Sequence, residues 1–525
     1  MEKHNKKPVK LNPIFIAGTG SDAGKSIIAA ALCRIFKQDG YNPAPFKAQN
    51  MSLNSYVTKD GLEMGRAQVV QAEAAKIPCH IDMNPVLLKP TGDCTSQLVV
   101  YGRPRGTYNA KMIFDNTIPE NLFSVAADSY YRLKNTYNPI VIEGAGSVSE
   151  INLYHADLAN SVTLDIATPE VILVADIERG GVFASVYGTV QILKKYKEID
   201  VKGIIINKFR GDVSLFTYGV GVLESMCGAP VLGIIPYFDD IHIEEEDSLA
   251  LQKKNLKAVR DRVNVCVVKL KHISNFTDFN ALERDGRVHL FYTDDKDELL
   301  KADIIIIPGS KNTIGDLKEL KKSGLDEVIR EANYRGTTVM GICGGYQMMG
   351  YEINDEDHVE SDVDFELGLG LLPVKTNLKK EKVTRQVRFR LATSPSAMRA
   401  ATASSVCHGY EVHMGKTTLM YKAKASPLTF MVDDETHKVI KPSRGLFRAT
   451  ENGCFLNRSC FGTYIHGILD NPQVVNFLLS PFLKEKSPRD TYNHAAFKEE
   501  QYDKLADHVR GCIDMAKLYE IMGNK

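Results

Sequence analysis

The chain has 525 residues, which is more than one hydrophobic core normally organises, so the sequence predicts two or more domains. Hydrophobic residues make up 44% of the chain and charged residues 25%, as in ordinary globular proteins. The 65 basic and 65 acidic residues cancel, which argues against a general nucleic-acid-binding protein.

The N-terminus and the cysteines indicate where the protein works. The first residues, MEKHNKKPVKLN, are basic but lack an apolar core, so we expect no signal peptide. No apolar run approaches the length of a membrane span, so we expect no membrane partner. The ten scattered cysteines include no C-x-x-C pair, which favours a reducing cytoplasm over a zinc site or a redox dithiol.

Short apolar runs alternate with helical patterns in the first part of the chain. Near-continuous Val and Ile in the runs, with helical crossovers, predict a parallel sheet covered on both faces, and we place this domain at residues 1–238. The predicted strands are PIFIAG, PIVIEGAG, EVILVAD, KGIIINK and VLGIIP, and the predicted helices are KSIIAAALCRIFKQDG, GRAQVVQAEAAK and GVFASVYGTVQILKKY.

A second α/β series follows an acidic and polar stretch, residues 239–258, which we interpret as a linker. The second domain is predicted over residues 259–475, and a polar helical extension over 476–525. We expect the stretch VRFRLATSPSAMRAATASS to be an irregular surface insertion. The predicted strands of this domain begin with RVNVCVVKL, RVHLFYT, ADIIIIPGS and TTVMGICGG.

The motif GTGSDAGKS follows the first predicted strand and opens a predicted helix. Glycine-rich backbone amides at a helix N-terminus form a phosphate cradle, so Gly18, Thr19, Gly24, Lys25 and Ser26 are candidate nucleotide ligands. Lys25 would reach the β and γ phosphates, and the Ser26 hydroxyl would ligate Mg²⁺. The glycines stand one residue further apart than in the strict P-loop pattern, so a chance Gly-Lys-Ser in a turn is the alternative.

Polar side chains end several of the predicted strands, where ligands of parallel sheets gather. Glu143 in VIEGAG is a candidate Mg²⁺ ligand, with a turn or cap role as the alternative. Asp176 holds a similar position with weaker support. Asn207 in INKFRGD could contact an adenine edge or simply shape a turn.

The motif GICGGYQMMG surrounds Cys343 with glycines between a predicted strand and a predicted helix. This is the pattern of a nucleophile elbow, in which a sharp turn exposes the reactive atom and small neighbours avoid clashes. The Gly344 N–H would face an oxyanion, and the helix N-terminus would lower the pKa of the thiol. A buried packing thiol is the alternative.

A cysteine nucleophile needs a base, and GTYIHGILD supplies His466 at the end of a short predicted strand. A structural histidine is the alternative, which pairing with Cys343 would disfavour. Gly309 and Ser310, in the strand-end loop of IIIIPGSKNT, could complete an oxyanion hole.

Three motifs, GICGGYQMMG, IIIIPGSKNT and GTYIHGILD, resemble a class I glutamine amidotransferase domain of the cobyrinate-amidase type. GTGSDAGKS with EGAG resembles the P-loop ligases related to dethiobiotin synthetase. Together with PFKAQNMSLNS, EMGRAQ, MNPVLLKP, VVYG, VADIERGG, NKFRGD and GYEVHMG, the set closely resembles the cobyric acid synthase family from about residue 12 to about residue 475.

The resemblance implies that ATP and glutamine drive amidation of the b, d, e and g carboxylates of adenosylcobyrinic acid a,c-diamide, giving adenosylcobyric acid in cobalamin biosynthesis. Cys343 would attack glutamine and release ammonia, with His466 as base. ATP with Mg²⁺ would form an acyl phosphate on the corrinoid, and ammonia would displace the phosphate. Lys47 matches a lysine near the phosphate and the substrate carboxylate. No prosthetic group is expected.

Many class I amidotransferases carry a Glu two residues after the histidine, where this chain has Ile468; the cobyrinate-amidase branch generally lacks this acid. The group that orients His466 is therefore open. Glu411 and His413 in GYEVHMG are polar candidates, unless they sit on a β-edge. The rival functions are cobyrinic acid a,c-diamide synthase, a glutamine-independent ligase with an inactive second domain, and a P-loop switch protein.

Overall fold

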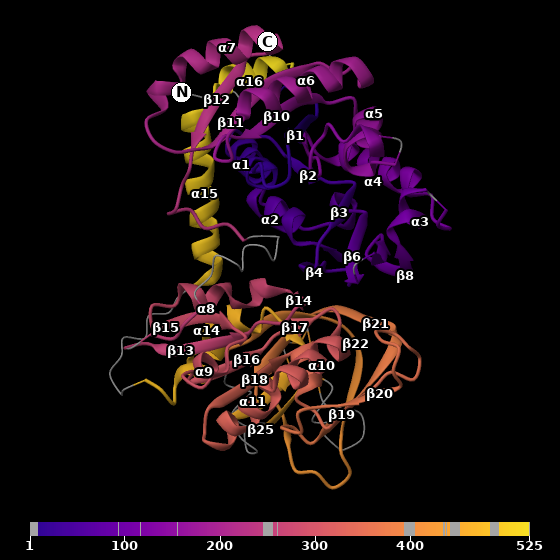
Figure 1. Cartoon of the computed structure of the whole chain (residues 1–525), viewed down its shortest axis with the longest axis vertical. Helices are drawn as coiled ribbons and strands as arrows, with labels where there is room; N and C mark the ends of the chain where they lie inside the picture. The colour runs from indigo at the N-terminus through magenta and orange to yellow at the C-terminus, as the bar shows by residue number, and fades with distance from the viewer. Residues whose placement is uncertain are drawn as a thin grey trace. The chain divides into compact units, whose positions relative to one another are not determined.

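The computed structural model divides the chain into two compact units, each with its own hydrophobic core (Figure 1). The first unit combines Met1–Ser52, Met64–Glu244 and Ala495–Lys525, and the second combines Leu53–Glu63 with Glu245–His494. Both units join stretches that are not contiguous in sequence, unlike the linear order of domains expected above. The structure describes residues 9–523 except positions 93, 116, 155, 245–255, 260, 393–404, 434–435, 437, 441–451 and 484–492.

A six-stranded parallel sheet forms the centre of the first unit, in the order β12-β11-β10-β1-β9-β2. The five strands predicted for this region are confirmed, and one short strand joins them at the edge. Strand β1 lies inside the sheet, so the loop that follows it opens between neighbouring strand ends. The strands are β1 (Ile14–Gly18), β2 (Ala44–Phe46), β9 (Ile140–Glu143), β10 (Glu170–Asp176), β11 (Val201–Phe209) and β12 (Val231–Pro236).

The three helices predicted for the first unit are also confirmed, and a smaller four-stranded sheet stands beside the main one. The helices are α1 (Lys25–Gln38), α2 (Arg66–Ala74), α3 (Ala110–Phe114), α4 (Leu122–Thr136), α5 (Thr163–Ala167), α6 (Val182–Lys197) and α7 (Thr217–Cys227). The smaller sheet contains β3 (Gln49–Met51), β6 (Val86–Gly92), β7 (Thr95–Val100) and β8 (Arg103–Asn109).

The last two helices, α15 (His494–Cys512) and α16 (Met515–Ile521), return to the first unit, where Figure 1 shows yellow α15 beside indigo α1. Tyr502, Leu505 and Val509 are buried in the same core as the apolar face of α1. A side chain at Gly233 on β12 would collide with the backbone where α15 ends. The C-terminal helices therefore complete the core of the first unit.

The second unit is built on a seven-stranded sheet in the order β15-β13-β16-β18-β26-β25-β23, parallel from β15 to β26. The four predicted strands are confirmed, and with the first unit this confirms the α/β fold class. The strands are β13 (Val263–Val268), β15 (Val288–Thr293), β16 (Ile304–Ile307), β18 (Thr338–Ile342), β23 (Ser426–Pro427), β25 (Gly453–Asn457) and β26 (Cys460–Thr463). The helices are α8 (Asn280–Arg284), α9 (Lys296–Leu299), α10 (Thr313–Ser323), α11 (Leu325–Tyr334), α12 (Gly344–Met348) and α14 (Pro472–Leu479).

A further sheet of the second unit has the order β20-β19-β21-β22-β27. Its strands are β19 (Glu352–Asn354), β20 (Phe365–Leu367), β21 (Val374–Leu391), β22 (Cys407–Leu419) and β27 (Ile465–His466), with β24 (Thr429–Met431) beside β21.

This sheet overturns two expectations. The residues VRFRL are not irregular: they form the end of β21 and pair with β22 and β24, while positions 393–404 lie outside the described residues. Glu411 and His413 are not on an edge either, because β22 lies between β21 and β27 and both side chains are buried. The alternation of polar residues in GYEVHMG predicts a strand but cannot show that other strands lie on both sides of it.

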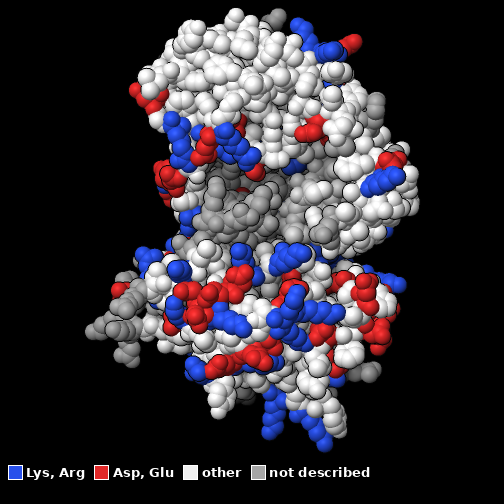
Figure 2. Space-filling view, in the orientation of Figure 1, with Lys and Arg blue, Asp and Glu red and all other residues white. Residues whose placement is uncertain are grey.

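Charged side chains on the face shown in Figure 2 alternate in sign over the second unit, as the balanced composition leads one to expect. In the described part of the chain, no helix combines the length and the apolar character needed to span a membrane.

Candidate functional site

The P-loop motif connects β1 to α1 in the first unit. Gly24 has a left-handed φ of 99°, a conformation that favours glycine. The Lys25 ammonium folds back over the loop and donates to the carbonyls of Gly20 (2.9 Å) and Gly146 (2.8 Å). Burial lowers the pKa of Lys25 to about 8, against the opposing effect of nearby carboxylates. A phosphate bound at this loop would therefore lie close to the buried Lys25 ammonium, whose hydrogen bonds to two carbonyls fix its position.

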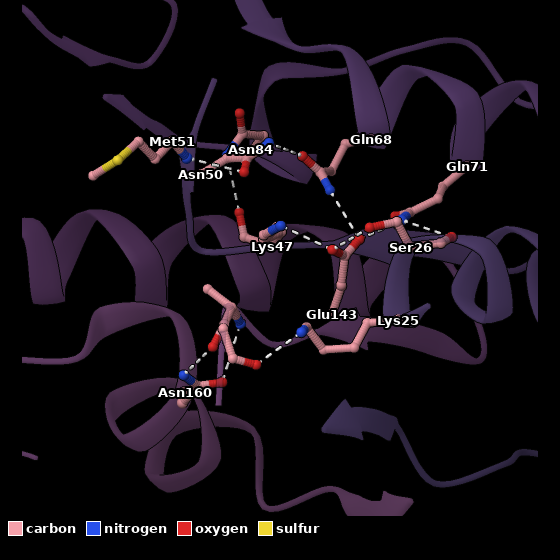
Figure 3. Close-up of polar contacts among 12 residues, drawn as sticks. Lys25, Ser26, Lys47, Asn50, Met51, Gln68, Gln71, Asn84, Glu143 and Asn160 are labelled. Carbon is pink, nitrogen blue, oxygen red and sulfur yellow. Dashed lines mark hydrogen bonds and ion pairs between the residues drawn. The ribbon is translucent and has the colours of Figure 1, made fainter. Parts of the chain in front are cut away.

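Glu143 ends β9 and is the polar centre of this site (Figure 3). Its Oε1 accepts from the Ser26 hydroxyl and the Lys47 ammonium, both at 2.8 Å. Its Oε2 accepts from Gln71 at 2.5 Å and from Gln68 at 3.4 Å. Burial alone would raise the pKa of Glu143, but the charge and hydrogen bond of Lys47 lower it overall. The carboxylate is therefore ionised beside the P-loop hydroxyl.

The donor set fits a hard divalent cation. Ser26 and Glu143 offer one hydroxyl and one carboxylate, the oxygen ligands that Mg²⁺ accepts when phosphates supply the rest. No cluster of three or more His, Cys, Asp or Glu side chains with metal-ligand geometry occurs among the described residues.

The other nucleotide candidates lie around the same loop. Asn207 donates from Nδ2 to the Ala23 carbonyl (2.9 Å), so its side chain braces the P-loop. The backbone amide of Thr19 donates to the carbonyl of Val174 (3.1 Å), which extends the pairing of β1 with β10 by one residue. Asp176 ends β10 directly beside Asn207 in the sheet register. The contact of Asn207 with an adenine edge stays a prediction.

In the second unit, Cys343 occupies the sharp turn between β18 and α12. Its φ of 51° is positive, which is costly for a residue with a side chain and is typical of strained functional turns. Its backbone N–H donates to the Thr463 carbonyl at 2.8 Å, which fixes the turn against β26. The side chain is buried, and its sulfur lies 3.7 Å from the carbonyl oxygen of Val412.

The glycines around Cys343 follow from this packing. A side chain at Gly341 would lie within 2.7 Å of the backbone of Gly345, and one at Gly345 would overlap the carbonyl of Ile307. At Gly344 it would lie 2.9 Å from the Ser310 amide nitrogen. The helix after Cys343 therefore passes very close to the strand-end loop that carries Ser310. The oxyanion-hole role of Gly344 and Ser310 stays a prediction.

His466 is paired on both sides. Its Nδ1 lies 2.7 Å from Oδ2 of Asp278, whose Oδ1 accepts from the Gly467 amide at 2.8 Å. Burial alone would lower the pKa of His466, but the charges of Asp278 and Cys343 and hydrogen bonds to both raise it to about 10. A side chain at Gly309 would lie 3.3 Å from the imidazole Cε1. The structure thus brings Cys343, His466, Gly309, Ser310 and Gly344 into one site.

Asp278 is the residue that sequence reasoning missed. It lies in a short 3-10 helix (Phe276–Phe279), far from His466 in sequence, and nothing in NFTDF marks it as functional. The expected candidates are used elsewhere. Glu411 accepts from Arg385 and from Asn452, and the His413 ring stacks on Tyr464.

Residues 14–250 match the CobQ/CobB/MinD/ParA nucleotide binding domain family, and residues 264–474 match the CobB/CobQ-like glutamine amidotransferase domain family. A cobyric acid synthase from Bacteroides fragilis is 56% identical over 512 residues, with 98% of each chain covered. One from Phocaeicola vulgatus is 53% identical with the same coverage. A crystal structure of a glutamine amidotransferase covers 41% of this chain and 97% of its own, at 15% identity and a TM-score of 0.29.

A P-loop nucleotide-binding unit and a glutamine amidotransferase unit on one chain define a glutamine-dependent amidoligase. More than half of the residues are identical to those of two cobyric acid synthases over nearly the full length of the chain. The chain therefore belongs to the cobyric acid synthase family. This confirms the resemblance found in the sequence motifs. The family carries out amidation in cobalamin biosynthesis, and its nucleotide-binding domain indicates the use of ATP.

Proposed function

We propose that this protein converts adenosylcobyrinic acid a,c-diamide into adenosylcobyric acid by amidating its b, d, e and g carboxylates with nitrogen from glutamine. Membership of the family supports the reaction class. The first unit carries the P-loop with Glu143, and the second unit carries Cys343 with His466. These two sites support a division of the reaction into carboxylate activation and ammonia production.

Ammonia production is assigned to the second unit. The Cys343 thiolate attacks the side-chain amide carbon of glutamine, and the amides of Gly344 and Ser310 stabilise the oxyanion. His466 carries the thiol proton to the departing nitrogen, so ammonia leaves and a glutamyl thioester remains. Water, deprotonated by His466, then hydrolyses the thioester and restores the thiol. Asp278 keeps the imidazole oriented through both steps.

Carboxylate activation is assigned to the first unit. A corrinoid carboxylate attacks the γ phosphorus of ATP, and ADP leaves. Ammonia then attacks the acyl carbon of the acyl phosphate, phosphate departs, and the nitrogen loses a proton to give the amide. Lys25 and Lys47 offset the charge of the transferring group. Ser26 and Glu143 would hold Mg²⁺, which neutralises phosphate charge when it is bound.

The observation that carries the proposal is the placement of His466 between Asp278 and Cys343 in a chain that also carries a complete P-loop site. A glutamine-independent ligase or a switch protein has no use for an aligned thiol, imidazole and carboxylate. The test is mass spectrometry of the a,c-diamide incubated with the enzyme, ATP, Mg²⁺ and glutamine. Products with up to four new amides are expected, and no mass change would contradict the proposal.

Cobyrinic acid a,c-diamide synthase is the second candidate, because related enzymes share both domain types. The same assay separates the two. A gain of two amides on cobyrinic acid, with no reaction on the a,c-diamide, would assign the chain to the diamide synthase.

A further inference from the structure

The turn that follows Glu143 shapes the nucleotide site of the first unit. We refer to residues 144–148 as the Glu143 turn. The carbonyl of Gly146, in the middle of this turn, accepts from the Lys25 ammonium at 2.8 Å, and the Gly20 carbonyl of the P-loop accepts from it at 2.9 Å. An ammonium has three N–H donors, so these two bonds fix the direction of the third. The position of the turn therefore helps to set the direction in which Lys25 can reach a phosphate.

One side chain, that of Asn160, holds the backbone of this turn. Its Oδ1 accepts from the Ala145 amide at 3.1 Å, and its Nδ2 donates to the Ala145 carbonyl at 2.8 Å. A neighbouring strand pairs the two backbone groups of a residue in the same way. The side-chain amides of Asn and Gln offer a separate donor and acceptor at this spacing, so the residue type suits this contact.

Asn160 is itself fixed in place. It is buried in the π-helix Leu158–Val162, a rare kind of turn that is frequent at functional sites. The carboxylate of Asp157 accepts from the backbone amide of Asn160 (3.0 Å) and from its Nδ2 (2.8 Å). Because Oδ1 and both hydrogens of Nδ2 are engaged, the side-chain amide keeps one orientation.

The fit between Asn160 and the Glu143 turn is close. A side chain at Gly144 would lie 2.4 Å from Oδ1 of Asn160 and 2.9 Å from the Phe15 ring, so the turn can approach only because Gly144 has none. Closely packed interiors transmit small shifts instead of absorbing them. A displacement of Asn160 would therefore move the turn, and with it the Gly146 carbonyl.

The need to satisfy backbone hydrogen bonds does not explain this arrangement. Ala145 and Gly146 are partly exposed, so water could pair with their backbone groups if the Asn160 side chain were absent. What the side chain adds is a defined position for the turn. This favours a role in the nucleotide site over a purely structural role for the buried amide.

We propose that Asn160 is a positioning residue for phosphoryl transfer: it holds the Glu143 turn so that the Gly146 carbonyl directs the Lys25 ammonium toward the transferring phosphate. The inference rests on the proposed role of Lys25 in carboxylate activation. It stays within the first unit and acts through the turn, not through contact with the nucleotide. A misplacement of about 1 Å at a reacting group can cost about 10²-fold in rate, so a remote side chain can control the step.

The test is ammonium-driven amidation of the a,c-diamide by the full-length protein, with kcat and the KM for ATP measured separately. Asn160→Ala removes both bonds to Ala145. We expect kcat to fall by about 10-fold or more, because Lys25 is misdirected in the transition state, with a smaller change in the KM for ATP. If this variant fails to fold, Asn160→Asp keeps the shape of the side chain and replaces only the Nδ2 donor, and it should show the same selective loss.

Asn138→Ala is the matched control, because Asn138 holds another residue of the first unit by the same two bonds. Its Oδ1 accepts from the Leu11 amide (3.0 Å) and its Nδ2 donates to the Leu11 carbonyl (2.8 Å). Leu11 precedes the start of β1, whereas the P-loop follows the end of that strand. Thermal unfolding should show a loss of stability in both variants, but only Asn160→Ala should lose kcat.

An Asn160→Ala enzyme with the kcat of the wild type, or a loss confined to the KM for ATP, would overturn the proposal. So would equal losses of kcat in Asn160→Ala and Asn138→Ala, because these mark a general loss of packing. Lys25→Ala is run in parallel: if it keeps near-normal ammonium-driven amidation, the proposed function of the P-loop has failed rather than the role of Asn160.

Discussion

Cys343 combines a strained backbone with contact to His466, so its replacement should separate the two halves of the reaction. Cys343→Ala should abolish amidation from glutamine but leave amidation from high concentrations of ammonium, because only ammonia production needs the thiolate. Both rates can be followed by mass spectrometry of the corrinoid. A mutant that hydrolyses glutamine at the normal rate would show that the nucleophile lies elsewhere.

Asp278 should set the pH dependence of the glutaminase. Its carboxylate helps to raise the pKa of His466 to about 10, so Asp278→Asn should lower that pKa, typically by about one unit or more for loss of an opposite charge. The alkaline limb of kcat/KM for glutamine hydrolysis should shift down in pH, with kcat about 10²-fold lower. An unchanged alkaline limb would exclude Asp278 as the orienting group.

The same pKa has a consequence for stability. Because the pKa of His466 is higher in the folded protein than its ordinary 6.5, the charged imidazole stabilises the fold fully below pH 6.5. The stabilisation is lost as pH rises through about 10. We expect the difference in Tm between wild type and Asp278→Asn to shrink above that pH, as measured by thermal unfolding. A constant difference would contradict the ion pair.

Residues of the site differ in how far sequence could reveal them. Cys343 was predictable because its glycine neighbours report a close approach that only a missing side chain permits. His466 was predictable only as a partner for that thiol. Asp278 was not predictable, because one carboxylate in a short 3-10 helix has the same local pattern as any cap or turn acid, and its meeting with His466 is decided by tertiary packing.

At the scale of elements, the P-loop between β1 and α1 should serve amidation from either nitrogen source. Lys25→Ala removes the buried ammonium that lies over the loop, and losing one clamp on a transferring phosphoryl group typically costs about 10²-fold or more in kcat. Ammonium-driven and glutamine-driven amidation should fall together. Near-normal ammonium-driven turnover would show that the widened loop is not the phosphate site.

Helix α15 should control the local stability of the first unit. Leu505 is fully buried against the core that includes α1, so Leu505→Ala should destabilise this unit by about 2–5 kcal/mol, as for large-to-small changes in other cores. Hydrogen exchange should accelerate in α1 and β12 but not in β18. Lys504→Ala, on the exposed side of α15, is the control. Equal loss of protection in β18 would contradict the assignment of α15 to the first unit.

The strands and crossover helices were predictable because buried parallel strands produce continuous Val and Ile runs of their own. The packing of α15 on the first unit was not predictable. Its apolar stripe, which contains Tyr502, Leu505 and Val509, shows that one face of the helix is buried but does not show which unit covers that face. Residues Leu53–Glu63, which pack in the second unit, gave no signal for a similar reason. Their anchors are backbone groups of residues such as Ser55 and Val57, which any sequence supplies.

For the whole molecule, the sequence contains one P-loop motif and one cysteine elbow. In the reaction proposed above, four carboxylates at different places on a corrin ring could not occupy one acyl-phosphate site together, so the ring would be repositioned between steps. We expect partially amidated intermediates early in a time course, and one ATP and one glutamine consumed for each new amide. Complete amidation with one ATP per corrinoid would contradict the acyl-phosphate mechanism.

The return of α15 and α16 to the first unit has a consequence for synthesis on the ribosome. The nucleotide-binding sheet emerges first, yet the helices that cover the apolar side of α1 emerge last, after the whole amidotransferase unit. During translation, the amidotransferase unit can therefore reach its final core before the nucleotide-binding unit does. The nascent chain meanwhile carries an uncovered apolar face on α1, which makes it a natural client for chaperones that bind such surfaces.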